Sequence, residues 1–128
     1  MRFYTVAMAS LAIDAPPKWT DNILSQYHVA DVIAARRGVP RRIPRTALIL
    51  LALTRELHLA IGMSVRDALA LAHDMLSNDD GTSRVRGLVR ITCDRDALES
   101  RLDERLREAL ESAPTPRRGR PPLRPVRQ

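Results

Sequence analysis

Residues 44–61 place the strongest constraint on the fold of this 128-residue chain. The run from residue 47 to residue 53 holds no polar side chain, and it continues into further leucines at helical spacing. One stripe of this helix contains Leu48, Leu51, Ala52 and Leu59, and the stripe is widened by Ile49, Leu50, Leu53 and Leu57. A helix that is apolar almost all round must pack against neighbours on more than one side. The sequence therefore predicts a mainly α fold with this helix at its centre.

Helix-breaking residues define the neighbouring elements. Pro16 and Pro17 separate an apolar helix over residues 6–13 from a second helix, because proline lacks an amide donor and constrains the residue before it. Gly62 suits the left-handed residue at the end of the central helix. Ser64 and Asp67 form a capping-box-like pair that begins a fourth helix. Residues 1–5 form a lead-in that is expected to be extended.

The second helix combines an apolar anchor with a polar face. Trp19 and Ile23 lie on one side by their i, i+4 spacing. Most polar side chains of this segment are expected elsewhere on the helix: Lys18, Thr20, Asp21, Asn22 and Ser25. A helix that reads the major groove needs such a face, and Lys18, Thr20 and Asn22 are the candidate base-contacting residues. The alternative is an ordinary solvated helix face.

Four arginines flank one turn in the segment that precedes the central helix. Residues 32–43 resemble a hairpin with its turn near Gly38, and the arginines are Arg36, Arg37, Arg41 and Arg42. Guanidinium groups this close repel one another unless water or an anion compensates them, and phosphate is the usual partner of such a ribbon. We therefore predict a β-hairpin wing whose arginines contact a nucleic-acid backbone. The alternative, a mobile basic loop, would also leave these arginines in contact with an anion.

The C-terminal half changes character after a polar linker at residues 77–84. Val85, Val89, Ile91 and Cys93 alternate with polar residues, as in a half-buried strand that needs a partner in the chain or in a second copy. An amphipathic helix over residues 94–112 follows, with an apolar stripe of Leu98, Leu102, Leu106, Ala109 and Leu110. Such a stripe either docks on the core of its own chain or pairs with a second helix. Residues 85–112 are therefore a candidate homodimerisation element.

The positive charge is concentrated at the C-terminus. Formal net charge is +6, and residues 114–128 hold five arginines and no acidic residue, so that residues 1–113 carry only about +1. Lys18 is the only lysine. Arginine matches phosphate and guanine edges, although GC-rich coding sequence produces the same bias. Residues 113–128 are rich in proline and arginine, and we expect them to be disordered in isolation.

The order of these parts resembles the MerR family of bacterial regulators. Those proteins carry a helix-turn-helix, an arginine-bearing wing, a third helix, a glycine break and a capped fourth helix. The matching residues are Arg36-Arg37-Gly38 and Arg41-Arg42-Ile43 in the wing, and Leu51 to Leu57, Ile61-Gly62-Met63-Ser64-Val65 and Ala68-Leu69 at the junction of the third and fourth helices. The resemblance covers residues 4–76 and implies a winged helix-turn-helix head over residues 1–76.

The chain also departs from that family. Trp19-Thr20-Asp21-Asn22 stands where family members often have an Arg-Tyr-Tyr-like run, so that base contacts do not carry over. The long coiled coil and effector domain are absent or shortened to residues 94–112, and the cysteine ligands of metal-sensing members are missing. The resemblance therefore implies a stand-alone DNA-binding protein, and it does not imply a ligand-sensing role.

A second motif lies in the tail. Arg118-Gly119-Arg120-Pro121 is similar to the core of an AT-hook. In that motif glycine lets the backbone lie on the floor of the narrow minor groove of A·T-rich DNA, and the two arginines extend along the groove. The alternative is a nonspecific basic tail, which would bind DNA without this sequence preference.

Few features favour other classes of protein. His28, His58 and His73 are scattered, with no cysteine or acid at a ligand-like spacing, and no glycine-rich phosphate loop is present. We therefore expect no enzyme activity, metal or cofactor. The apolar run at 47–53 is far shorter than the ~18 residues of a membrane span. Residues 6–13 are short for a signal peptide and are followed by Asp14.

These patterns predict a cytoplasmic, nucleoid-associated protein that binds double-stranded DNA as a transcriptional regulator or nucleoid factor. The rival hypothesis is a protein–protein interaction module, such as an adaptor or antitoxin-like protein, whose basic tail binds an acidic partner. The two hypotheses differ in the salt dependence of duplex binding, which is steep when several phosphates are contacted.

Overall fold

The computed structural model describes residues 2–77 and 83–112. Its elements in chain order are β1 (Phe3–Tyr4), α1 (Val6–Ile13), α2 (Pro17–Gln26), β2 (Ile43–Pro44), α3 (Arg45–Ala60), α4 (Val65–Leu76), β3 (Ser83–Arg86), β4 (Val89–Thr92) and α5 (Arg95–Ser112). The protein is mainly helical, as the sequence predicted, with small antiparallel sheets. No helix in these residues is long and apolar enough to cross a membrane.

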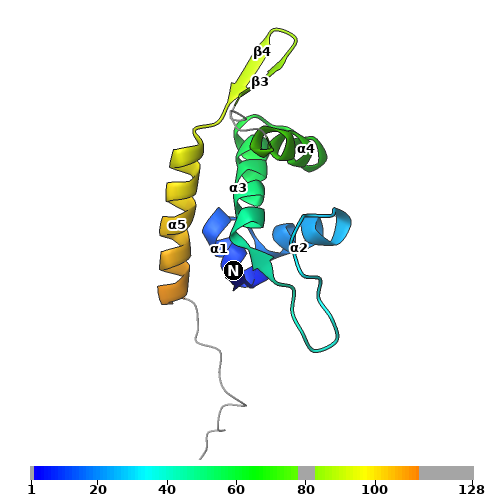
Figure 1. Cartoon of the computed structure of the whole chain (residues 1–128), viewed down its shortest axis with the longest axis vertical. Helices are drawn as coiled ribbons and strands as arrows, with labels where there is room; N and C mark the ends of the chain where they lie inside the picture. Colours follow the sequence, from blue (N-terminus) through cyan, green and yellow to red (C-terminus); the bar gives the residue numbers. More distant parts are fainter. Residues whose placement is uncertain (1, 78–82, 113–128) are drawn as a thin grey trace, which may run out of the picture.

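Helix α3 is the centre of the fold, which confirms the prediction from its apolar run. It lies between α4 and α5 and also packs against α1 (Figure 1). Leu48 and Leu51 are completely buried on it, and so is the hydroxyl-bearing Thr54, which donates a hydrogen bond to the Leu50 carbonyl. Because neighbours surround this helix, almost every side of it has to be apolar.

Local capping explains where the helices begin and end. The Ser64 side chain accepts a hydrogen bond from the Asp67 amide at 3.1 Å, as the capping-box-like pair predicted. Gly62 has a φ of +80° just after α3, a conformation that costs glycine little. Pro17 occupies the first turn of α2, where the missing amide hydrogen leaves no bond unmade.

The N-terminal lead-in is a strand, as expected. Phe3 and Tyr4 of β1 pair antiparallel with Pro44 and Ile43 of β2. Since β2 immediately precedes α3, this pairing holds the first turn of the central helix beside residues 3–4.

A hairpin precedes β2, with its turn where the sequence placed it. Ile33 and Arg42 exchange two backbone hydrogen bonds of 2.9 Å, and Arg36 and Val39 exchange another two, of 2.8 and 2.9 Å. Gly38 in the turn has a φ of +75°, a value that a side chain rarely allows. We call residues 33–42 the wing.

The segment predicted as one strand over residues 84–93 is instead a complete two-stranded hairpin. Strands β3 and β4 pair antiparallel, with Arg86 opposite Val89. The prediction was wrong because the alternation of apolar residues continues across the turn. Gly87, with a φ of +60°, supplies the tight two-residue turn that reverses the chain.

Helix α5 docks on its own chain. Leu98, Leu102 and Leu106 are buried in the common core, and the helix packs against α1 and α3. The apolar stripe is therefore not available for pairing with a second helix, as the dimerisation hypothesis required. Of its members Leu110 is the most exposed, at 43%.

Ion pairs add to the docking of α5. Arg45, at the start of α3, donates two hydrogen bonds of 2.8 Å to the two carboxylate oxygens of Asp103, and one of 3.1 Å to Glu99. Arg101 pairs with Glu56 farther along α3. A planar guanidinium suits this two-pronged contact, which fixes the rotation of α5 as well as its position.

The Arg45–Asp103 pair predicts a feature of acid unfolding. The hydrogen bonds from Arg45 hold the pKa of Asp103 below its usual value. A carboxyl with a lowered folded-state pKa contributes stability above the unfolded pKa of about 3.9, and that stability is lost as pH falls through the folded pKa. We expect Asp103→Asn to reduce stability by no more than about 1 kcal/mol at neutral pH, because both side chains are partly exposed.

The measurement is urea unfolding between pH 7 and pH 2. Wild type and Asp103→Asn should converge at the acid end. Glu104→Gln, an exposed carboxyl in the middle of the same helix, is the control for general charge loss. A constant difference between wild type and Asp103→Asn at every pH would contradict the expectation.

Candidate nucleic-acid interface

The exposed face of α2 is the first part of the site. Lys18, Asp21, Asn22, Ser25 and Gln26 are exposed along it, whereas Ile23 is buried beneath. Asp21 and Asn22 lie three and four residues after Lys18, and Ser25 and Gln26 lie three and four residues after Asn22, so that these side chains form one ridge along the helix.

Contacts between Trp19 and α3 hold α2 in place on its inner side. Trp19 is half-buried, with the Arg55 guanidinium 4.9 Å from the centre of its ring and the His58 ring centroid 6.3 Å away. A cation over an indole face is attracted by the ring quadrupole. The exposed ridge of α2 is therefore carried by a helix with a fixed rotation.

Thr20 does not belong to this ridge, and its assignment as a base-contacting residue was wrong. Its side chain is completely buried, and its Oγ1 accepts a hydrogen bond of 2.8 Å from the Ser10 Oγ of α1. Thr20 lies three residues before Ile23, on the same inner side of the helix, where it packs against α1. Its polarity suggested a solvated position, but a hydroxyl with a buried partner fits an interior equally well.

The Ser10–Thr20 pair leads to a prediction about stability. Thr20→Val keeps the shape but leaves the Ser10 hydroxyl unsatisfied in the interior, which costs about 1–3 kcal/mol. Adding Ser10→Ala removes the orphaned group, so the double variant should recover part of that loss. Urea unfolding of the four proteins in the cycle measures the coupling. Equal losses in the Thr20→Val single variant and the double variant would contradict a role for this hydrogen bond.

The wing arginines fall into two groups. Arg36, Arg37 and Arg42 are exposed, and among residues 2–77 and 83–112 none of them has a carboxylate partner. Arg41 is different: its side chain is only 15% exposed and lies 2.6 Å from Asp21 and 3.5 Å from the Ser25 hydroxyl. Three arginines thus remain available for an anion, while the fourth is a structural contact.

The Arg41 contact determines how wing and helix lie relative to each other. Asp21 and Ser25 both belong to the exposed ridge of α2, so their bonds to Arg41 bring the wing beside that ridge. In Figure 1 the wing is the long loop that projects past α2, away from the β3–β4 hairpin at the other end of the molecule. Lys18, Asn22 and the three free arginines consequently share one end of the protein.

Gln26 is a member of the ridge that the sequence analysis did not single out. It is exposed and lies one turn beyond Asn22. An amide side chain can pair with adenine in the same way as asparagine. The i+4 spacing from Asn22 is the signal that could have identified it.

Arg118, Gly119 and Arg120 of the AT-hook-like motif lie outside the described residues. In the part of the chain that the structure describes, no group of three histidine, cysteine, aspartate or glutamate side chains is arranged to hold a metal ion.

The chain matches no protein-family model, no curated protein sequence and no solved structure. The MerR and AT-hook resemblances therefore remain hypotheses that rest on the residues quoted for them.

Proposed function

We propose that this protein binds double-stranded DNA through α2 and the wing, as a bacterial transcriptional regulator or nucleoid-associated factor with a MerR-like winged head. The observation that supports this most is the Arg41–Asp21 contact, which brings a cationic hairpin beside an exposed polar helix face. In the proposed complex α2 enters the major groove and the wing follows the phosphate backbone.

The dimensions of α2 suit this role. A helix with its side chains is about 10–12 Å wide, and the major groove of B-DNA is about 12 Å wide. Lys18, Asn22 and Gln26 follow one another at intervals of four residues, about 6 Å along the axis. That interval approximates two base-pair steps, so that the three side chains would sample several neighbouring base edges.

Phosphate chemistry accounts for the wing. Arg36, Arg37 and Arg42 have their guanidinium groups in solvent, and the wing itself carries no acidic residue. Each guanidinium that neutralises a phosphate releases condensed counterions, which favours binding at low salt. The wing would supply affinity and register, whereas α2 would supply base preference.

The tail would add a second, tethered contact. If Arg118, Gly119 and Arg120 act as an AT-hook, residues 114–128 prefer A·T-rich minor grooves next to the site of the head. Linking two weak contacts raises the effective concentration of the second. A cytoplasmic location on the nucleoid follows from this function.

The test is selection of bound duplexes from a random pool, with the full chain and with a chain that lacks residues 114–128. We expect a fixed motif from both proteins and A·T-rich flanks from the full chain only. If neither protein binds a duplex at 50 mM salt, the proposal is refuted.

The rival proposal, a protein interaction module, has lost one of its supports because the leucine stripe of α5 is buried. It still predicts that the basic tail prefers an acidic protein to DNA. Duplex affinity that changes little between 50 and 200 mM salt would favour it, since a protein contacting several phosphates loses affinity steeply over this range.

A further inference from the structure

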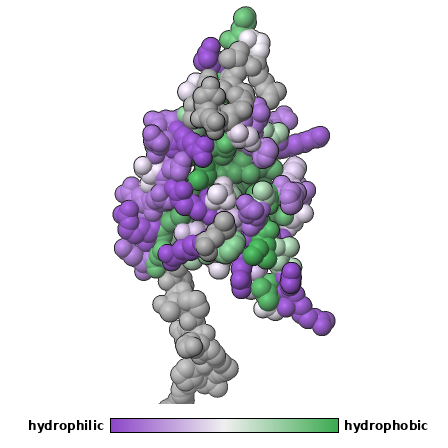
Figure 2. Space-filling view, in the orientation of Figure 1, coloured by the Kyte–Doolittle hydropathy of each residue, from purple (hydrophilic) through white to green (hydrophobic). Residues whose placement is uncertain are grey.

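The β3–β4 hairpin, which we call the arm, ends in apolar side chains at the extreme end of the molecule. It projects beyond α3 and α4, and its tip carries hydrophobic colour (Figures 1 and 2). Leu88, in the two-residue turn, is fully exposed, and Val89 is 59% exposed. Burying a leucine side chain is worth about 1.5–3 kcal/mol, so that these two adjoining apolar side chains offer a partner surface that would gain from being covered.

One face of the arm continues into the body of the protein. Val89, Ile91 and Cys93 alternate along β4 and beyond it, and they therefore share a face. Exposure falls along this series, from the exposed Val89 to the half-buried Ile91 and Cys93. An apolar strip thus begins in solvent and ends inside the molecule.

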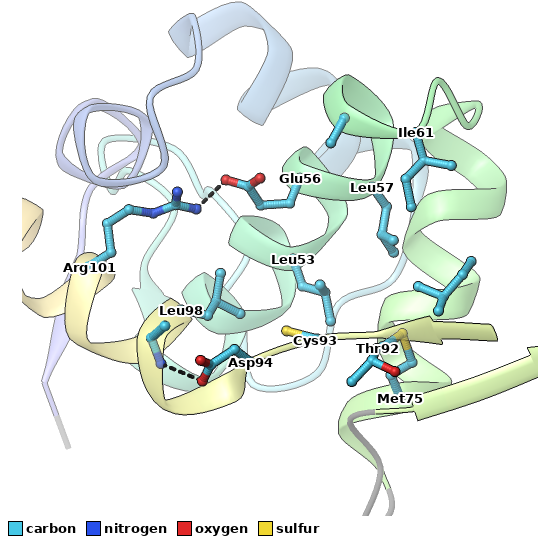
Figure 3. A pocket seen from close by; sticks show the side chains of 13 residues that line it. Leu53, Glu56, Leu57, Ile61, Met75, Thr92, Cys93, Asp94, Leu98 and Arg101 are labelled. Atoms are coloured by element: carbon cyan, nitrogen blue, oxygen red, sulfur yellow. Dashed lines mark hydrogen bonds and ion pairs between the residues drawn. The ribbon is translucent and has the colours of Figure 1, made fainter.

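The inner end of that strip is a wall of a pocket of about 370 Å³. Helices α3, α4 and α5 supply the other walls, which are largely apolar and include Leu53, Leu57 and Leu98. Figure 3 shows Leu53, Leu98 and Cys93 directed into the space, with the Glu56–Arg101 ion pair at its edge. The pocket opens to solvent, and its concave, largely apolar lining makes it a candidate site for an apolar partner.

The arm cannot fill the pocket of its own chain. Ile91 and Cys93 already form its wall, and Leu88 and Val89 lie farther out along an extended hairpin. Four residues of strand separate Val89 from Cys93, about 13 Å. A hairpin with only two strands is also marginally stable by itself. Tip and pocket are complementary in chemistry but too far apart to meet within one molecule.

We propose that a second copy of this chain supplies the occupant, with two arms lying antiparallel about a two-fold axis and each tip covering the pocket of the other copy. An axis beside Ile91 places Val89 opposite the partner's Cys93, on the face that lines the partner's pocket. The same surface is used twice, as a two-fold interface requires.

Charge disfavours the axis that lies one residue closer to the tip. An axis shifted by one residue would pass beside Arg90 and bring two identical guanidinium groups together. Like charges directly opposite one another destabilise paired strands. The neighbouring arrangement is therefore disfavoured, whereas the axis at Ile91 joins apolar groups. The proposal concerns the end of the molecule opposite the wing and does not depend on DNA binding.

The single cysteine provides a direct test. Val89→Cys introduces a second thiol that should lie opposite the partner's Cys93. Directly opposed residues of antiparallel strands have Cα atoms about 4.5–5.5 Å apart, within the range of a disulfide. We expect oxidation to yield a covalent dimer on a non-reducing gel. Burial raises the pKa of the Cys93 thiol, so oxidation is best carried out at alkaline pH.

Two controls make the result specific. Wild type should give no covalent dimer, because the two copies of Cys93 would lie four residues apart. Arg90→Cys, on the opposite face of β4, should not cross-link either. Equal cross-linking of Arg90→Cys and Val89→Cys, or a monomeric wild type in sedimentation at every concentration, would overturn the proposal.

A charged variant provides a second readout. Leu88→Asp with Val89→Asp should abolish the dimer in sedimentation while leaving the helical circular dichroism unchanged, because both side chains are exposed. The chain that lacks residues 114–128 should still dimerise. If deletion of residues 114–128 instead makes Cys93 more reactive to a thiol reagent, and the protein is monomeric, then the tail occupies the pocket and the proposed dimer is wrong.

Discussion

Replacing Arg36, Arg37 and Arg42 together by alanine is expected to weaken duplex binding about 100-fold at 0.15 M salt. All three side chains are exposed on the wing, and within the described residues none is neutralised by a carboxylate. If each contacts one phosphate, the slope of log K against log salt should become shallower by about 0.9 per arginine removed. Fluorescence anisotropy of a labelled duplex at several salt concentrations measures both quantities.

A matched pair of double variants separates the wing from net charge. Arg36→Ala with Arg37→Ala removes two charges from the wing, and Arg105→Ala with Arg107→Ala removes two from α5. The second pair should change the affinity and the salt slope much less. Similar losses in both double variants would mean that total charge, not the wing, governs binding, and our assignment of the interface would be wrong.

Arg41 requires a separate expectation because its guanidinium is held by Asp21. Arg41→Ala should leave the salt slope nearly unchanged while lowering the affinity, since the wing would lose its attachment to α2. No local pattern in the sequence separates Arg41 from its neighbours. Which of four closely spaced arginines meets a carboxylate depends on how the hairpin closes against α2, and Asp21 is twenty residues away in the chain.

Most helices could be predicted from local signals. The apolar run of α3, the Ser64–Asp67 cap and the double proline before α2 act within a few residues, and the structure agrees with all three. The wing was also predictable, because Gly38 marks its turn and Pro44 begins the next element. Such signals determine where an element lies in the chain but not what it packs against.

Two of the differences concern packing over longer distances, and one concerns a local turn. Thr20 is polar, so the sequence placed it in solvent, yet Ser10 of another helix provides its partner. The arm was taken for one strand because apolar alternation says nothing about whether a chain turns. The leucine stripe of α5 was left open between two uses, since docking in one chain and pairing of two chains require the same spacing.

The last prediction tests how α5 uses that stripe. Leu102 is almost completely buried against the core of its own chain, and Leu102→Ala should lower the free energy of unfolding by about 2–5 kcal/mol. Because the contact is intramolecular, the loss should be the same at every protein concentration. Leu110 lies two turns farther along the same helix and is 43% exposed, so Leu110→Ala should lower the free energy of unfolding by much less than Leu102→Ala.

Urea unfolding of both variants, each made in the Leu88→Asp, Val89→Asp background that abolishes the arm dimer, at a low and a high protein concentration distinguishes the two uses of the stripe. A helix pair between two copies would make the effect of Leu102→Ala depend on concentration, because dissociation would accompany unfolding. A concentration-independent loss assigns the stripe to the core of one chain. The arm is then left as the apolar surface in residues 85–112 that a second copy can cover, and α5 positions the pocket that would receive it.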